Sequence, residues 1–517
     1  MMIKTKLPLR LSLIIFITAM VIASPLLFGG YHGEDEALTQ LAVEETVEGI
    51  KTFDLFLIAK ALGSDWHPPG RNLLPVPFFM VFGDSLWVLR LPNMILWAVA
   101  CVAAGWWASA IASESLSEEL SHRVGVVSGL WLATSGLFQL EGMGLGHVGP
   151  TLGGLILLIY LSTHPPRPLL DSDEKRNYLI SGTIAGVSFI WFSSMLAVAG
   201  MLHLCYLLAC LRAGADYRRP ALVNWLVLSI PFGVFYVVYY AVFLGVPYYM
   251  LLNGFVNAPF GQLHQYIVRS GNAQLGVTSL IENMRVLNYY LLPGVGPLIT
   301  VTGVFLLIRR KPNVGIVFLP YAFLFCFYIN GNTSQHFLSF AVWVFPLSVG
   351  FVAARVSSSQ LALHAGIAIV TLQTLWTGIF HIYPYTATNY PYRAFAAWGE
   401  VLWPNNIYEP VHQISKALSL VGAQGTLSNQ TSGYWELQVL PDLDWVHVAP
   451  KMGPGNVCAI GPPSVIGKAV VASLVYEGQW APCVNFSVDW IRFPGSNLSI
   501  AVYDKGVWRA WLSASKN

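Results

Sequence analysis

A series of long apolar runs between residues 11 and 382 constrains the fold of this sequence more than any other feature. The runs have about 17 to 24 residues, the length that an α-helix needs to cross the hydrocarbon core of a bilayer. Charged residues make up only 10% of the chain, whereas an ordinary soluble domain has about 25%. Most of the chain therefore cannot face water, and the sequence predicts an α-helical polytopic membrane protein.

The apolar runs predict eleven transmembrane helices. The first run, Leu11–Phe28, is interpreted as an uncleaved signal anchor, with a cleaved signal peptide as the alternative. The stretch Leu73–Phe82 is too short to span and contains two prolines, so we expect an interfacial or re-entrant helix there. The predicted spans are 11–29, 90–112, 124–140, 146–163, 178–195, 197–211, 221–244, 289–308, 313–330, 337–355 and 361–381.

The basic residues between the runs indicate how the chain is oriented. With eleven spans, most of these residues fall on the side of the N-terminus, which the positive-inside rule assigns to the cytoplasm. Three larger segments are then extracytoplasmic: the outer loops 29–89 and 245–288, and the tail. Arg90 begins a span on that outer side, where we expect its side chain to reach toward the lipid–water boundary.

The sequence predicts two domains. Residues 1–382 form the membrane domain, and residues 383–517 form a soluble α/β or β-rich domain, in which the β-rich runs are Ala469–Tyr476 and Leu498–Tyr503. Cys458 and Cys483 lie in the tail and would form a disulfide if the compartment is oxidising. The formal net charge of +2 does not indicate a nucleic-acid partner.

Three consecutive carboxylates, Glu34, Asp35 and Glu36, follow the first span. They precede a predicted amphipathic helix, Leu38–Ile50, in which Leu38, Leu41, Ala42 and Glu45 are spaced by threes and fours along one face. One interpretation is an acidic first turn stabilised by the helix dipole. The other is a functional site, because crowded carboxylates at a membrane surface hold a cation or act as a base.

A second motif, His67-Pro68-Pro69, follows in the same outer loop. The prolines favour an extended backbone, and we expect a rigid turn that directs His67 and Arg71 outward. Cationic and hydrogen-bonding side chains of this kind bind phosphate. An interfacial turn without a ligand is the alternative interpretation.

The order of these features closely resembles the first luminal loop of the GT-C glycosyltransferases. It runs span, acidic pair, amphipathic helix, His-Pro-Pro, short apolar helix, Phe-Gly-Asp-Ser at 82–85, and Leu-Arg-Leu-Pro at 89–92. The nearest members are protein O-mannosyltransferases and lipid A aminoarabinose transferases. The resemblance covers residues 11–112 in motif and order, and the remaining chain in topology.

The resemblance implies roles for the carboxylates. The family's acidic pair matches Asp35 and Glu36, with Asp35 as the general base. Where many members have an Asp near the end of a later span, this chain has Glu141 and His147 instead. If the protein uses a divalent metal, Glu34, Asp35 and Glu141 are the expected ligands.

The resemblance also implies residues that bind the phosphate of a lipid carrier. His67 and Arg71 match the His-Pro-Pro motif and its following basic residue. Arg269 lies in the later outer loop, which covers the carrier in the family. His336 stands where many members have Arg-Tyr, so this position departs from the family pattern.

The sequence thus predicts a membrane glycosyltransferase that uses a polyprenyl-phosphate-linked sugar and inverts the sugar carbon. Its acceptor is a hydroxyl of a glycan, a lipid or a protein. We expect a bacterial inner membrane, with the N-terminus cytoplasmic, the tail periplasmic and membrane lipids around the spans. The alternatives are a transporter or flippase of lipid-linked sugars and a non-catalytic membrane scaffold.

Overall fold

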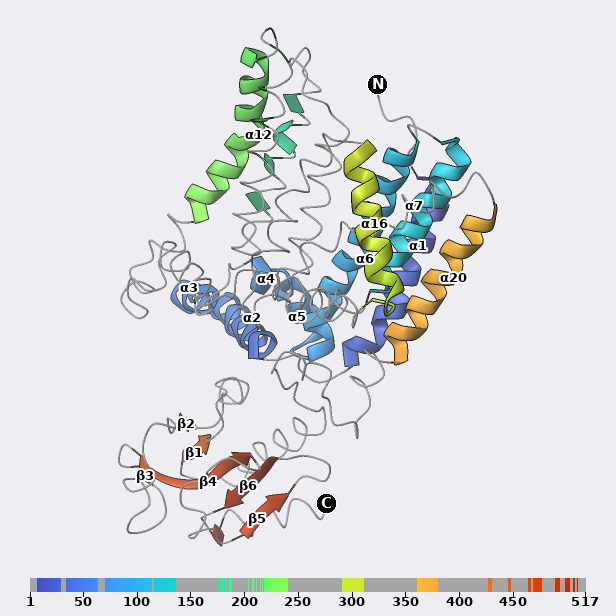
Figure 1. Cartoon of the computed structure of the whole chain (residues 1–517). Coiled ribbons are helices and arrows are strands. Elements are labelled where there is room, and N and C mark those ends of the chain that lie inside the picture. The colour runs from blue at the N-terminus through green and yellow to red at the C-terminus, as the bar shows by residue number, and fades with distance from the viewer. Residues whose placement is uncertain are drawn as a thin grey trace, which may run out of the picture. The chain divides into compact units, whose positions relative to one another are not determined.

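The computed structural model describes seven long stretches of the chain and several shorter ones (Figure 1). The chain divides into two compact units, Met1–Phe28 with Ala42–Ile382 and Gly29–Leu41 with Tyr383–Asn517. The described residues are 7–28, 34–63, 70–113, 116–135, 218–239, 291–310 and 360–379, short pieces between 175 and 216, six strands between 426 and 502, and residues 505–506 and 509.

Six predicted spans overlap described helices. Two of these helices are long and apolar enough to cross a membrane, Leu9–Leu27 with 19 residues and Trp87–Ala112 with 26. The helices are α1 (Leu9–Ala23), which continues as the 3₁₀ turn η1 (Ser24–Phe28), α6 (Leu86–Ala112), α7 (Glu118–Ala133), α12 (Arg218–Tyr239), α16 (Val295–Arg310) and α20 (Gln360–Thr377). The other five predicted spans lie wholly or mostly outside the described residues, so the count of eleven stays a prediction.

Helices α1 and α6 are antiparallel and are joined by hydrogen bonds near both ends. Near one end, Arg90 of α6 donates from Nη1 to the carbonyl oxygen of Leu26 at 2.5 Å. Near the other, Trp106 donates from Nε1 to Ser12 Oγ at 2.8 Å. The expectation that Arg90 reaches toward the lipid–water boundary is wrong, because its side chain is only 1% exposed. Its guanidinium instead satisfies a carbonyl at the end of a helix, a group that has no intrahelical partner.

Glycines allow α1, α6 and α7 to pack closely. A Cβ atom on Gly125 of α7 would lie 2.7 Å from the carbonyl oxygen of Gly105 on α6, and one on Gly105 would lie 2.9 Å from that of Gly125. The side chain of Ile15 on α1 would meet a Cβ on Gly105 at 2.9 Å and one on Gly129 at 2.8 Å. Small residues commonly bring membrane helices together in this way, since packing rather than water exclusion holds them.

We expect Gly125→Ala to lower the free energy of unfolding by about 1–3 kcal/mol, because the new methyl group would force the two backbones apart. Gly233→Ala on α12 is the matched control, since a Cβ there meets no atom within 4 Å. Thermal unfolding in detergent measures both variants. Equal unfolding temperatures would contradict the close packing of α6 and α7.

A buried polar network joins α7, α16 and α20. Thr377 donates to the Thr134 carbonyl at 2.5 Å, and Gln373 donates to Thr377 Oγ1 at 3.0 Å. The amide N–H of Leu292, just before α16, donates to Gln373 Oε1 at 2.5 Å. The end of α7, the end of α20 and the beginning of α16 therefore lie at one level. Helix α7 runs parallel to α20 and antiparallel to α16, the directions that the predicted topology requires.

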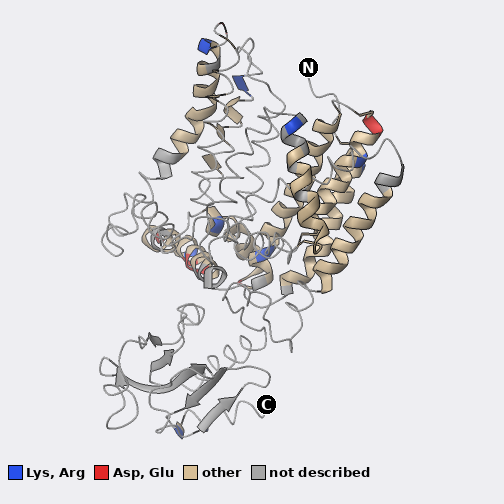
Figure 2. Cartoon of the chain, viewed as in Figure 1, with Lys and Arg blue, Asp and Glu red and all other residues tan. Residues whose placement is uncertain are grey.

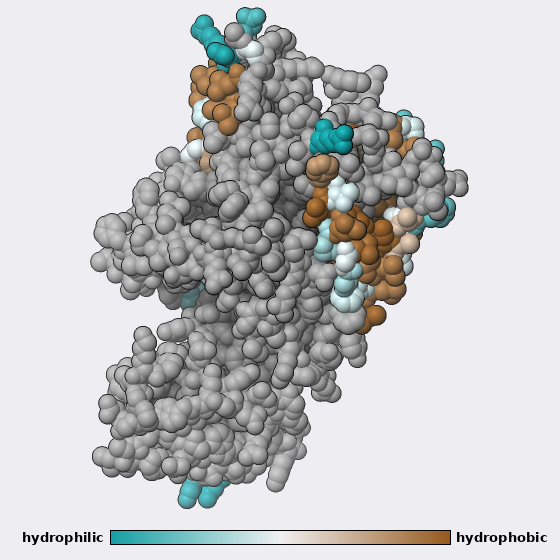
Figure 3. All heavy atoms as spheres, viewed as in Figure 1, coloured by the Kyte–Doolittle hydropathy of each residue, from teal (hydrophilic) through white to brown (hydrophobic). Residues whose placement is uncertain are grey.

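Charges lie near the ends of these helices. Figure 2 shows the basic ends of α12 and α16 and the charged beginning of α7 toward the same side as the N-terminus. This grouping agrees with the predicted topology, and the assignment of that side to the cytoplasm stays a prediction. Between the ends, apolar side chains are exposed on α12, α16 and α20, as the hydrophobic surface over these helices shows (Figure 3). A hydrophobic exposed belt of this kind suits contact with lipid chains.

Two helices of the first outer loop, α2 (Glu34–Thr52) and α3 (Leu55–Gly63), meet at a tight corner. The Asp54 N–H donates to the Gly49 carbonyl at 2.8 Å and the Phe53 N–H to the Ile50 carbonyl at 3.4 Å, which is the Schellman motif. Phe53 occupies the left-handed position of this motif, with φ 56°. Glycine usually fills that position, and a bulky residue there costs roughly 1–2 kcal/mol. Asp54 then caps α3, accepting at Oδ1 from the N–H groups of Phe56 and Leu57.

Two short helices complete the described part of the loop, α4 (Gly70–Leu73) and α5 (Val76–Phe82). Helix α5 confirms a short helix within the predicted stretch Leu73–Phe82, although it begins only after Pro75. It ends at Gly83, whose φ of 88° favours glycine. The chain then enters α6 within three residues, so α5 is tied closely to the first turn of that helix.

The strands of the second unit form one sheet with the order β2-β1-β4-β6-β5, in which β3 pairs with β4 outside this path. Strand β1 is parallel to β2 and β4, while β4, β5 and β6 form antiparallel pairs. The two β-rich runs of the sequence fall on β4 and β6. The strands are β1 (Thr426–Asn429), β2 (Trp445–His447), β3 (Ser464–Val465), β4 (Lys468–Tyr476), β5 (Asp489–Arg492) and β6 (Leu498–Val502).

Candidate functional site

The acidic motif opens helix α2. Glu34, Asp35 and Glu36 are its first three residues, while their side chains lie outside the description. Carboxylates in the first turn of a helix are stabilised by its unpaired N–H groups and its dipole. The motif thus occupies the place that the dipole interpretation requires. The same place suits a catalytic carboxylate, because the helix fixes the backbone that carries it.

Helix α2 is anchored against α5 and the beginning of α6. Val43 and Val47 are buried together with Val76 and Phe79 of α5 and with Val88 and Leu89 of α6. The apolar cluster therefore anchors the Ala42–Thr52 part of α2, which follows the acidic motif in the chain.

The described side chains of α2 test part of its predicted face. Of the predicted face, Ala42 is buried and Glu45 is half-buried, while the side chains of Leu38 and Leu41 lie outside the description. The packing is centred on Val43 and Val47. Ala42 therefore agrees with the predicted spacing, and Val43 and Val47 extend the buried face beyond the predicted residues.

Helix α4 carries two consecutive buried polar side chains, Arg71 and Asn72, which are 1% and 0% exposed. The expectation that Arg71 points outward is wrong, because the chain turns into a helix at Gly70 and buries both residues. A buried guanidinium is costly unless an anionic or hydrogen-bonding group compensates its charge. Its burial is compatible with a role in phosphate binding, which stays a prediction.

Asn72 is a residue that sequence reasoning missed. Within the described part of the chain, neither its Oδ1 nor its Nδ2 atom has a hydrogen-bond partner. Such a buried amide requires a reason, since native proteins satisfy most buried polar atoms. Its position beside a predicted phosphate-binding arginine was the available signal in the sequence.

The remaining predicted site residues lie outside the described residues. They are His67, Glu141, His147, Arg269, His336, Cys458 and Cys483. Among the described residues, no group of three or more His, Cys, Asp or Glu side chains could hold a metal ion. Because Glu141 and the side chains of Glu34 and Asp35 lie outside the described residues, the metal site of these three residues stays a prediction.

The sequence matches no protein-family model and no curated protein, but the fold has relatives among solved structures. ArnT from Cupriavidus metallidurans, bound to undecaprenyl phosphate, matches over 96% of this chain and 98% of its own, with a TM-score of 0.58 and 12% identity. The archaeal oligosaccharyltransferase AglB from Archaeoglobus fulgidus, in complex with an inhibitory peptide and a dolichol-phosphate, matches over 86% of this chain and 65% of its own. Its TM-score is 0.50 at 12% identity.

The chain has the GT-C fold. The resemblance that the first outer loop indicated is therefore confirmed at the level of the fold. Relatives with the GT-C fold are polytopic membrane proteins, in agreement with the composition and the apolar helices. At 12% identity the likeness carries no residue role, so the roles of Asp35, Glu36 and the predicted phosphate ligands stay predictions.

Proposed function

We propose that this chain is a membrane glycosyltransferase that transfers a sugar from a polyprenyl-phosphate carrier to a hydroxyl acceptor on the extracytoplasmic side. The main support is the GT-C fold, shared over 96% of the chain with a structure that is bound to undecaprenyl phosphate. The acidic motif at the beginning of α2, anchored by the apolar cluster, supplies the carboxylates that this reaction requires.

Asp35 is the proposed general base, and Glu36 completes the acidic pair. The acceptor hydroxyl donates a hydrogen bond to Asp35 and loses its proton to that carboxylate as its oxygen forms a bond to C1 of the sugar. The bond from C1 to the phosphate oxygen breaks at the same time, and the polyprenyl phosphate leaves with the electron pair. A single displacement inverts the configuration at C1.

The leaving phosphate gains negative charge, which preplaced cations stabilise. Arg71 is the proposed cation whose position the structure describes, with His67, Arg269 and His336 as further proposed contacts. The prenyl tail must stay in lipid while the phosphate and the sugar lie at the interface. The first outer loop suits this arrangement, because α5 joins it to α6 directly.

The proposed organisation places catalysis in residues 1–382 and an extracytoplasmic domain in residues 383–517. In a bacterial inner membrane the second domain would be periplasmic, where Cys458 and Cys483 could form their disulfide. The proposed acceptor is a hydroxyl of a glycan, a lipid or a protein.

The test is transfer of radiolabelled sugar from a set of defined polyprenyl-phosphate sugars by the purified protein, with and without EDTA. We expect transfer from at least one donor, and we expect EDTA to leave the rate unchanged because the proposed base needs no metal. A rate that falls with EDTA and returns with a divalent ion would establish a metal requirement. If the protein binds none of the carriers and transfers sugar from none of the donors, the proposed function is contradicted.

A further inference from the structure

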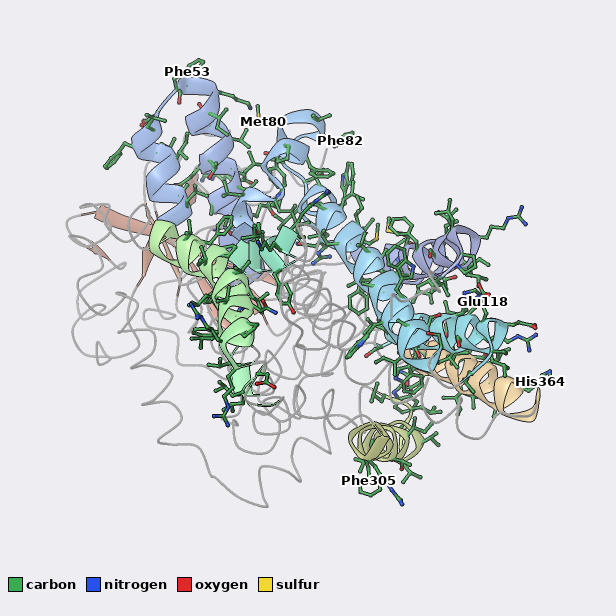
Figure 4. All side chains as sticks on the ribbon, turned by 90° about the horizontal axis from the view of Figure 1, so that it is seen from above. Phe53, Met80, Phe82, Glu118, Phe305 and His364 are labelled. Carbon is green, nitrogen blue, oxygen red and sulfur yellow. The ribbon has the colours of Figure 1, made fainter. Side chains whose placement is uncertain are left out.

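The first outer loop exposes apolar side chains at two places. At the corner between α2 and α3, Phe53 is 91% exposed and Leu55 79%, and Phe56 is exposed beside them. On α5, Met80, Val81 and Phe82 are exposed. Figure 4 shows Phe53, Met80 and Phe82 projecting from the same edge of the first compact unit, Met1–Phe28 with Ala42–Ile382. We refer to these six residues as the loop rim.

Phe53 is unfavourable in water for two independent reasons. Its backbone is in the left-handed conformation of the Schellman motif, where glycine would have no steric strain. Its ring is also almost fully exposed, so it gains no burial within the protein. Neither feature stabilises the fold, and contact with an apolar medium outside the protein would account for the aromatic ring.

The orientation of the first outer loop indicates where an apolar medium outside the protein would contact Phe53. Helix α3 and the Ala42–Thr52 part of α2 are seen nearly along their axes in Figure 1 and from the side in Figure 4. Helix α16 is seen from the side in Figure 1 and along its axis in Figure 4. The α2–α3 hairpin therefore lies across the direction of the membrane helices, with Phe53 at its tip. A hairpin in this orientation can lie along a bilayer surface.

The level of the loop rim is fixed by α5 and α6. Helix α6 has 27 residues and is about 40 Å long, longer than the hydrocarbon core of about 30 Å. A helix of this length extends beyond the core, and we infer that its first turn lies at the interface. Phe82 lies beside Trp87 of that turn, with ring centroids 6.0 Å apart. Aromatic side chains at a helix end are typical of the membrane boundary.

We propose that the loop rim inserts into the interface of the extracytoplasmic leaflet and holds the α2–α3 hairpin against the bilayer. Lys51, Asp54 and Asp84 are exposed next to the loop rim, so the insertion is shallow and their charges remain in water. A bilayer suits this surface better than a protein partner does, because the loop rim consists of a convex tip and a separate short helix rather than one continuous face. The proposal does not depend on the transferase reaction.

The test places the photoreactive residue p-benzoylphenylalanine at position 53 or 82 of the full chain, in nanodiscs that contain phospholipids with an alkyne on the acyl chain. Lys505, an exposed residue of the tail, is the control position. We expect several-fold more lipid labelling from positions 53 and 82 than from 505. Labelling no higher than at 505, or a cross-link to a second copy of the chain in place of lipid, would overturn the proposal.

A second measurement uses Phe53→Gly, which relieves the left-handed strain. With p-benzoylphenylalanine at position 56, we expect this variant to show several-fold less lipid labelling, because the tip has lost its anchor. Its unfolding temperature in detergent should be equal to or above that of the parent. A lower unfolding temperature would mean that Phe53 stabilises the protein itself, and unchanged labelling would mean that Phe53 is no anchor; each outcome contradicts the proposal.

Discussion

Asp35→Asn is expected to lower the rate of sugar transfer by about 10²–10⁴-fold, the usual effect of losing a general base. The amide has nearly the same shape as the carboxylate but cannot take the proton of the acceptor hydroxyl. The fold should be retained, because the apolar cluster at Val43 and Val47 anchors α2 independently of its first turn. Initial rates with radiolabelled donor, together with thermal unfolding in detergent, measure the two effects separately.

Glu34→Gln and Glu48→Gln are the matched controls for Asp35→Asn. Glu34 lies in the same first turn, so its replacement loses a similar dipole interaction of about 0.3–1 kcal/mol without removing the proposed base. Glu48 is exposed on the same helix, and its replacement should change neither property. If Asp35→Asn retains most of its activity, or if Glu48→Gln loses as much, Asp35 is not the base.

Local properties of the sequence predicted the helices well. Hydropathy depends on neighbouring residues, so the runs 90–112 and 361–381 identified α6 and α20 closely. The ends were less accurate, since α16 begins at Val295 rather than at 289. The structure shows bends and turns over residues 291–294, and apolar composition alone does not distinguish these from a helix.

Long-range contacts could not be predicted from one sequence. Leu292 and Gln373 are 81 residues apart, and Thr134 and Thr377 are 243 apart, yet these pairs align three helices. The polar residues in the last span were the available signal, because a buried amide or hydroxyl among apolar residues needs a partner. Only the fold shows which partner each residue has.

The sequence predicted which residue types form the candidate site, but it did not predict which of their side chains are buried. The acidic motif was expected before an amphipathic helix, and the structure includes it in the first turn of that helix. The interpretation of Arg71 was wrong because it assumed that the prolines keep the backbone extended beyond Gly70. Helix formation at Gly70 buries Arg71 and Asn72 instead, and burial is a tertiary property that no local pattern specifies.

Arg71→Met and Arg90→Met are expected to differ in their effect on the rate per folded molecule, although both arginines are 1% exposed. Arg71→Met should lower kcat/KM by about 10²–10³-fold, as expected when one preplaced donor to a developing anion is removed. Removing one partner from a buried charged contact also lowers stability, so this rate is taken per folded molecule. Arg71→Lys, which keeps the charge but loses the planar fork, should have an intermediate rate.

Arg90→Met should lower the free energy of unfolding by about 1–3 kcal/mol, because the Leu26 carbonyl loses its buried donor. Its rate per folded molecule should stay near that of the parent, since Arg90 joins α6 to the end of η1 and has no proposed contact with the carrier. The comparison requires rates divided by the folded fraction, taken from thermal unfolding in the same detergent. If Arg71→Met loses stability but keeps its rate per folded molecule, Arg71 has the structural role that we assign to Arg90, and the phosphate contact must come from elsewhere.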